Sequence, residues 1–173
     1  MHFATIKEVD IANGAGVRVS LFVSGCTHRC QDCFNDIAWD FQYGEEFTQE
    51  TIDYILKALS PSYIKGLSLL GGEPMEPSNQ QGLLPLLRQF KQMYPDKDVW
   101  CYSGYVLEEL LEGGKAHIDI TNEILNDIDI LVDGKFVAEL KDIRLKFRGS
   151  SNQRIIDMKK TIQSKNIVLW EEK

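Results

Sequence analysis

The stretch Ser24–Asn35, SGCTHRCQDCFN, is the segment around which the rest of the chain is organised. It places three of the four cysteines, Cys26, Cys30 and Cys33, in the spacing C-x3-C-x2-C. Thiolates are soft ligands that suit zinc, copper(I) and iron–sulfur clusters. A 4Fe–4S cluster normally takes four protein ligands, so three nearby thiolates would leave one iron open to a small molecule. We therefore predict a 4Fe–4S cluster on these cysteines, which are then both metal ligands and catalytic residues.

Three other interpretations of the same cysteines compete with the cluster. His28 lies inside the loop and would complete a Cys3His zinc site, although structural zinc sites usually draw two ligand pairs from separate segments. A disulfide fits the even cysteine count, but Cys101 is remote and nothing in the sequence indicates secretion. Cysteines that serve as small buried apolar residues are seldom crowded into a polar loop. We rank the cluster first, zinc second and the disulfide third.

Length, net charge and apolar content limit the classes of protein to which this chain can belong. The chain has 173 residues, which fits a single domain over residues 1–173. Its net charge of −7 argues against nonspecific nucleic-acid binding, which depends on Lys and Arg contacts to phosphates. No apolar run is long enough to span a membrane, and Met1–Lys7 lacks the features of a signal peptide. We expect a cytoplasmic protein whose thiols stay reduced.

The hydrophobic pattern alternates between strands and helices. Strands are predicted over residues 3–9, 17–23, 66–70, 98–102 and 128–132. Helices are predicted from an N-cap at Thr48 to before Pro61, from an N-cap at Ser78 with Pro85 in its first turns, and over residues 107–111 and 121–126. This alternation predicts an α/β fold with a mostly parallel sheet and too few units for a full eight-stranded barrel.

The C-terminal part of the chain is less regular. Residues 143–147 have the composition of a strand, and Ile155 and Ile156 fit either a strand or a helix. Residues 167–170 are predicted to form the last strand.

Polar or glycine-containing motifs follow three of the predicted strands, where α/β folds usually place their chemistry. Gly71-Gly72-Glu73-Pro74 is either a tight turn or a place where the backbone approaches a ligand while Glu73 takes a cation. Ser103 is either a helix cap or a ligand contact. The pair Asp133 and Lys135 is either a surface ion pair or part of the same site. We expect Cys101 to be packing and His28 to face solvent.

Taken together, these motifs resemble a known family. The cysteine spacing is similar to that of the radical S-adenosylmethionine superfamily, and the flanking Gly16–Gly25 and Cys33-x-Asn35 resemble its glycyl-radical activating enzymes. Residues 102–105, 133–136 and 148–154 resemble the activators of the anaerobic ribonucleoside-triphosphate reductase. One departure is Asp32, since an aromatic residue often precedes the last cysteine in the superfamily.

The resemblance implies a partial, open (β/α) barrel that binds S-adenosylmethionine beside the cluster. It implies that Gly71, Gly72, Glu73 and Pro74 bind the amino group of this cofactor, that Ser103 contacts its methionyl or ribose part, and that Asp133 and Lys135 lie near it. Arg148 and Asn152 fall in a polar loop of the same family type, without an assigned role.

The resemblance also implies a function. The cluster would cleave S-adenosylmethionine reductively, and the 5′-deoxyadenosyl radical would generate a glycyl radical on the large subunit of the anaerobic ribonucleoside-triphosphate reductase. A low-potential electron donor such as flavodoxin is implied as a further partner. Two alternatives stay open: a radical enzyme that acts on a small molecule, such as 7-carboxy-7-deazaguanine synthase, and a zinc or iron–sulfur binding module without enzymatic activity.

Overall fold

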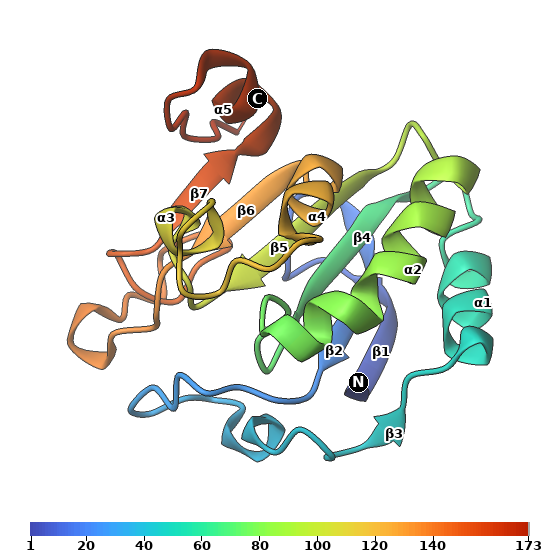
Figure 1. Ribbon diagram of the computed structural model, residues 1–173, viewed down its shortest axis with the longest axis horizontal. Helices are drawn as coiled ribbons and strands as arrows, with labels where there is room; N and C mark the ends of the chain where they lie inside the picture. Colours follow the sequence, from blue (N-terminus) through green and yellow to red (C-terminus); the bar gives the residue numbers. More distant parts are fainter. Residues whose placement is uncertain (173) are drawn as a thin grey trace.

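The protein folds around one seven-stranded sheet, which Figure 1 shows in a computed structural model that describes residues 1–172. The strand order is β3-β1-β2-β4-β5-β6-β7. The strands are β1 (His2–Asp10), β2 (Val17–Val23), β3 (Glu45–Glu46), β4 (Ile64–Gly71), β5 (Asp98–Ser103), β6 (Ile130–Asp133) and β7 (Arg154–Asp157). The helices are α1 (Gln49–Ala58), α2 (Pro77–Met93), α3 (Leu107–Leu110), α4 (Thr121–Asp127) and α5 (Met158–Ser164).

The centre of the sheet is parallel and its margins are antiparallel. Strands β2, β4, β5 and β6 pair in parallel, whereas β1 and β3 on one side and β7 on the other pair antiparallel to their neighbours. The predicted α/β fold is therefore confirmed, and the predicted parallel pairing holds for the central strands of the sheet. The sheet is open, because β3 and β7 form separate edges and do not pair with each other.

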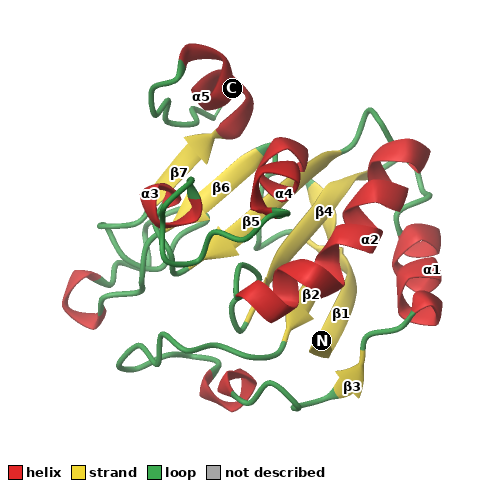
Figure 2. Ribbon diagram, in the orientation of Figure 1, coloured by secondary structure: helices red, strands yellow, loops and turns green. Residues whose placement is uncertain are grey.

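Alternation along the strands gives the sheet two different faces. Val19 and Leu21 of β2, Leu67 and Leu69 of β4 and Val99 of β5 belong to the main apolar core, and all are fully buried. The helices α1, α2 and α4 cover this face (Figure 2). The residues between them, such as Ser68, Trp100 and Tyr102, point to the opposite face, because successive side chains of a strand alternate.

Helix α2 shows where packing overrides a local preference. It begins at Pro77, with Glu76 as its N-cap, so the prediction of Ser78 as the cap was wrong by two residues. Pro85 lies in the middle of the helix and not in its first turns, which corrects a second prediction. An interior proline costs about 3 kcal/mol, and burial of Leu83, Leu86 and other apolar side chains around it offsets that cost.

The C-terminal region differs most from the predictions. Residues 143–147 form turns and bends, and Ile143 is 92% exposed, so no strand forms there. Residues 167–170 contribute one isolated bridge, Ile156 to Leu169, in place of the predicted last strand. Ile155 and Ile156 do form a strand, β7, which continues directly into the short helix α5. No helix in the described part of the chain is both long and apolar enough to cross a membrane.

Candidate functional site

The functional site lies at the edge of the sheet where the parallel strands end. Cys26, Cys30 and Cys33 follow β2, and all three line one cavity of about 360 Å³. Gly71 at the end of β4, Gly72 and Glu73 directly after it, and Ser103 at the end of β5 line the same cavity. The motifs at these strand ends therefore meet, because the carboxyl ends of parallel strands lie at one edge of the sheet.

The cysteine loop is held by backbone hydrogen bonds to segments on either side of it. The amide of Ser24 donates to the carbonyl of His2 (3.0 Å), and the amide of Gly25 donates to the carbonyl of Ala38 (2.7 Å). Within the loop, Asp32 has a left-handed φ of 56°. Asp tolerates this region better than most residues, which gives a local reason for Asp32 at a position where the superfamily often has an aromatic residue.

Burial raises the pKa of two cavity thiols, those of Cys26 and Cys30, and so favours their neutral form. The pKa of Cys26 is raised to about 11, chiefly by burial; a backbone hydrogen bond at His28 opposes this rise, and the nearby carboxylate of Glu73 adds to it. The pKa of Cys30 is also raised, by burial first and by Cys33 second. A coordinated cation favours the deprotonated thiolate over the neutral thiol. The thiols therefore fit a site that becomes charged only when iron is bound.

The spacing of the donors distinguishes a cluster from a single ion. In residues 1–172, no three His, Cys, Asp or Glu side chains come close enough together to hold one metal ion. The three free cysteines nevertheless line one cavity. Thiols spread around a shared space suit a polynuclear iron–sulfur core, whereas the Cys3His zinc alternative requires four donors converging on one point.

Gly71 and Gly72 allow the end of β4 to approach the end of β2. Gly71 has a φ of +111°, and a Cβ atom there would lie 2.6 Å from the backbone nitrogen of Val23. A Cβ atom on Gly72 would lie 2.6 Å from the carbonyl oxygen of Gly25. These contacts explain the glycine pair by backbone packing against the base of the cysteine loop. Pro74 is buried and lies outside the cavity wall.

Glu73 joins three strand ends through one buried carboxylate. Its Oε1 accepts hydrogen bonds from the amide of Met75 and the hydroxyl of Ser103, both at 2.8 Å. Its Oε2 accepts from the amide of Gly104 (2.6 Å) and contacts Nε2 of His28 (2.8 Å). Four partners occupy the lone pairs of a carboxylate, so the side chain of Glu73 organises the site around its negative charge.

His28 has a different position from the one expected. Its side chain is only 5% exposed, so the prediction of a solvent-facing residue was wrong. The imidazole contacts Glu73 and packs edge-on against Tyr105, with ring centroids 4.3 Å apart. Gly104 leaves room for it, because a Cβ there would lie 2.5 Å from Cδ2 of His28. His28 thereby connects the cysteine loop to the end of β5, which local sequence could not show.

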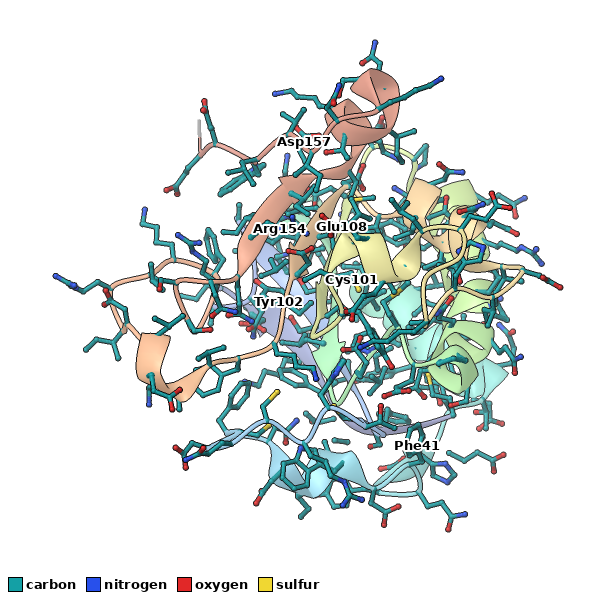
Figure 3. The ribbon with its side chains drawn as sticks, turned by 60° about the vertical axis from the view of Figure 1, so that its left-hand side comes forward. Phe41, Cys101, Tyr102, Glu108, Arg154 and Asp157 are labelled. Carbon is teal, nitrogen blue, oxygen red and sulfur yellow. The ribbon has the colours of Figure 1, made fainter. Side chains whose placement is uncertain are left out.

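Asp133 and Lys135 follow β6 but point in different directions. The carboxylate of Asp133 is fully buried and accepts two hydrogen bonds from Arg154, with 2.9 Å between Oδ1 and Nε. Arg154 also pairs with Glu108, and Figure 3 shows these two side chains together. Lys135 is exposed, and its charge slightly opposes the burial that raises the pKa of Cys30. Neither side chain lines the cavity, so their contact with a cofactor stays a prediction.

The polar loop after β6 forms another wall of the cavity. Arg148 lines the cavity, and its guanidinium group donates to the carbonyl of Gln153 (2.5 Å). The side-chain amide of Asn152 donates to the carbonyl of Lys135 (2.8 Å). Sequence reasoning missed several other lining residues, and most of them are aromatic or apolar: Phe34, Trp39, Leu70, Tyr102, Val132, Phe136, Leu145 and Phe147. Strand alternation could have identified Leu70 and Tyr102, which face away from the helices.

Cys101 lies apart from the other cysteines. It is fully buried within the main apolar core on the helix-covered face, and burial raises its pKa well above the usual value. The expectation that Cys101 serves packing is confirmed.

Comparison with known proteins first identifies the class. Residues 12–156 match the family model of a 4Fe–4S single cluster domain, which covers the cysteine loop and all the strand ends that meet at the cavity. The chain is therefore an iron–sulfur protein of this domain class, in agreement with the three thiols of its cavity.

Comparison with curated relatives then identifies the family. The chain is 43% identical to the anaerobic ribonucleoside-triphosphate reductase-activating protein of Vibrio cholerae serotype O1, over 90% of this chain and 97% of the relative. It is 42% identical to the protein of that name from Escherichia coli strain K12, over 88% and 96%. The protein of that name from Enterobacteria phage T4 is 37% identical, over 90% and 93%. The chain belongs to the family of anaerobic ribonucleoside-triphosphate reductase-activating proteins, as its motifs indicated.

Proposed function

We propose that this chain is a radical S-adenosylmethionine enzyme that activates the anaerobic ribonucleoside-triphosphate reductase by generating a glycyl radical on its large subunit. The observation that carries the proposal is the cavity in which Cys26, Cys30 and Cys33 meet Glu73 and Ser103. The names of the curated relatives support the reductase as the target. The cytoplasm, where thiols stay reduced, is the proposed compartment.

Three cysteines hold the cluster in this proposal and leave one iron for S-adenosylmethionine. When bound, the reduced cluster supplies the electron that cleaves S-adenosylmethionine to methionine and a 5′-deoxyadenosyl radical, which takes a hydrogen atom from glycine. That electron comes from a low-potential donor such as flavodoxin. The thiolates of Cys26, Cys30 and Cys33 would bind and orient the cluster on a loop whose first residues are hydrogen bonded to His2 and Ala38.

The strand ends position the cofactor. Gly71 and Gly72 bring the backbone of the β4 end against the cysteine loop, which places Glu73 next to the cluster ligands. The negative charge of Glu73 favours the cationic amino group of S-adenosylmethionine, and Ser103 is held by that same carboxylate. In this proposal Pro74, Asp133 and Lys135 support the turns that surround the cofactor.

The apolar wall of the cavity protects the reaction. Leu70, Val132, Phe136 and Phe147 supply apolar side chains to the cavity wall. A primary carbon radical must meet its target hydrogen before it reacts elsewhere, so excluding water and other donors favours the intended transfer. We also propose that the sheet curves as a partial, open (β/α) barrel. Residues 1–173 form a single domain in this proposal.

The test is anaerobic incubation of the reconstituted protein with the reductase, S-adenosylmethionine and a chemical reductant. We expect a glycyl radical in the electron paramagnetic resonance spectrum and an equal amount of 5′-deoxyadenosine. Formation of 5′-deoxyadenosine with consumption of a small pterin-like substrate, and no glycyl radical, would instead indicate an enzyme of the 7-carboxy-7-deazaguanine synthase type. A colourless protein with one zinc ion per chain would refute both.

A further inference from the structure

The three most exposed large apolar side chains in residues 1–172 belong to segments that line the same cavity. Ile143 is 92% exposed, Phe34 is 87% exposed and Ile11 is 74% exposed. Scattered exposed apolar residues are normal on a protein surface. The most exposed ones here all belong to segments that line one cavity, which points to an interaction surface.

Each of these residues is tied to the cavity by its own segment. Phe34 lines the cavity directly, one residue after Cys33. Ile11 precedes Ala12 and Asn13, which also line it. We call Ile11, Phe34 and Ile143 the apolar rim.

Ile143 is tied to the cavity through the connection between β6 and β7. This connection contributes Phe136, Leu145 and Phe147 to the cavity wall on either side of Ile143. Figure 1 shows the connection, in orange, and the cysteine loop, in blue, projecting from the same side of the molecule. The segments that carry the apolar rim therefore border the cavity of the proposed site.

The charge of the β6–β7 connection limits what can bind there. Residues 135–148 carry five basic side chains, Lys135, Lys141, Arg144, Lys146 and Arg148, against the acidic Glu139 and Asp142, in a chain whose net charge is −7. Arg144 and Lys146 are paired with Asp142 and Glu172. Lys141 is exposed and forms no ion pair with any residue that the structure describes. This surface therefore complements an acidic partner.

We propose that the apolar rim, with Lys141 beside it, is the docking surface for the reductase polypeptide that carries the glycine, through a segment that combines apolar and acidic side chains. This inference rests on the proposed function, since it assigns the partner of the same site. Burying exposed apolar side chains supplies the affinity, at roughly 25 cal/mol per Å². The basic connection supplies orientation and association rate. A second copy of this chain fits less well, because a two-fold contact would bring the two basic connections together.

The decisive variant is Ile143→Glu, since residue 143 lies outside the cavity wall and its side chain makes no core contact. The matched control is Met93→Glu, because Met93 is 56% exposed and lies at the end of α2 on the helix-covered side. Reductase binding is measured with the reconstituted protein by anaerobic titration. Ile143→Glu is expected to weaken binding at least about tenfold, a loss of about 1.4 kcal/mol. Met93→Glu is expected to change it by less than about twofold.

Two further measurements separate docking from chemistry. Ile143→Glu should bind S-adenosylmethionine as the wild type does, because the substitution leaves the cavity wall unchanged. Lys141→Glu should weaken reductase binding and reduce its dependence on salt, because a complementary charge is lost.

Several results would overturn the proposal. Equal reductase affinity for Ile143→Glu and Met93→Glu would show that the rim is not the docking surface. Weaker S-adenosylmethionine binding by Ile143→Glu would show that the substitution disturbs the cofactor site and does not act on docking alone. A wild-type dimer that Ile143→Glu converts to monomers, with unchanged reductase affinity, would assign the rim to self-association. Failure of the proposed function looks different: the wild type would bind the reductase through the rim and yet form no glycyl radical.

Discussion

The two faces of the same four parallel strands serve different purposes. On the helix-covered face, residues such as Leu21, Leu69 and Cys101 are fully buried in one apolar core. On the other face, Leu70 and Tyr102 line a cavity that opens to solvent and contains the three remaining cysteines. Neighbouring residues in one strand thus contribute to stability or to chemistry according to their position in the alternation. Cys101 lies in β5 on the core face, whereas the other three cysteines lie in the loop after β2, so cysteines of one chain have unrelated roles.

The largest expected effect is the loss of the cluster when a cavity cysteine is removed. Cys26→Ala, Cys30→Ala or Cys33→Ala should abolish both the brown colour after anaerobic reconstitution and the activity, since three thiolates are the minimum that leaves one open iron. Cys101→Ala should retain the cluster, because Cys101 lies in the core. Iron and sulfide analysis measures both. A full cluster in any of the three cavity variants would contradict the ligand assignment.

The second prediction compares two adjacent residues of β4. Leu69→Ala should lower the free energy of unfolding by about 2–5 kcal/mol, because it leaves a void in a closed core. Leu70→Ala should cost less than half as much, because its side chain already faces a cavity. Urea unfolding of the cluster-free protein measures both values. Equal losses would show that the two faces are not energetically distinct.

The sequence predicted the central strands of the sheet better than the contacts between distant side chains. The positions of β2, β4 and β5 followed from alternating or continuous apolar residues, and the meeting of their ends followed from parallel topology. The roles of His28 and Arg154 could not be inferred, because both side chains act on residues distant in sequence, namely Glu73 and Asp133. Residues 167–170 have strand-like composition, but only Leu169 finds a strand partner. Local propensity alone therefore does not decide strand formation there.

The third prediction concerns Glu73. Glu73→Gln should keep the brown colour but weaken S-adenosylmethionine binding about tenfold or more, since it removes a charge and directs an amide donor at existing donors. Equilibrium binding to the reconstituted protein measures the effect. Unchanged affinity would remove Glu73 from the cofactor site.

A smaller effect is expected at His28. His28→Ala should destabilise the cluster-free protein by about 1–3 kcal/mol, because it leaves Oε2 of Glu73 with one partner fewer in a buried position. His28→Gln should recover part of the loss, because its amide group can donate to the same oxygen. The double variant with Glu73→Gln should be non-additive. Simple additivity in thermal unfolding would show that the two side chains do not interact.

The smallest effect is a pH dependence of the cluster-free protein. Burial raises the pKa of Cys26 from its usual 9.0 to about 11. Between these values the folded state binds more protons than the unfolded state, so this group's contribution to stability is complete below pH 9 and is lost as the pH rises toward 11. Alkylation of Cys26, followed by mass spectrometry, should accelerate over the same interval, since the thiolate is the nucleophile. A rate that levels off near pH 9 would contradict the burial of this thiol.

The most direct test of the central claim follows the hydrogen atom itself. The wild-type protein is reconstituted under anaerobic conditions and incubated with S-adenosylmethionine, a reductant and reductase in which glycine carries deuterium at its α-carbon. Mass spectrometry of the 5′-deoxyadenosine should show one added deuterium, together with a glycyl radical on the reductase. If the 5′-deoxyadenosine is unlabelled and its amount equals that of the radical, the hydrogen comes from another position. That result would contradict the proposal that this cavity acts on glycine.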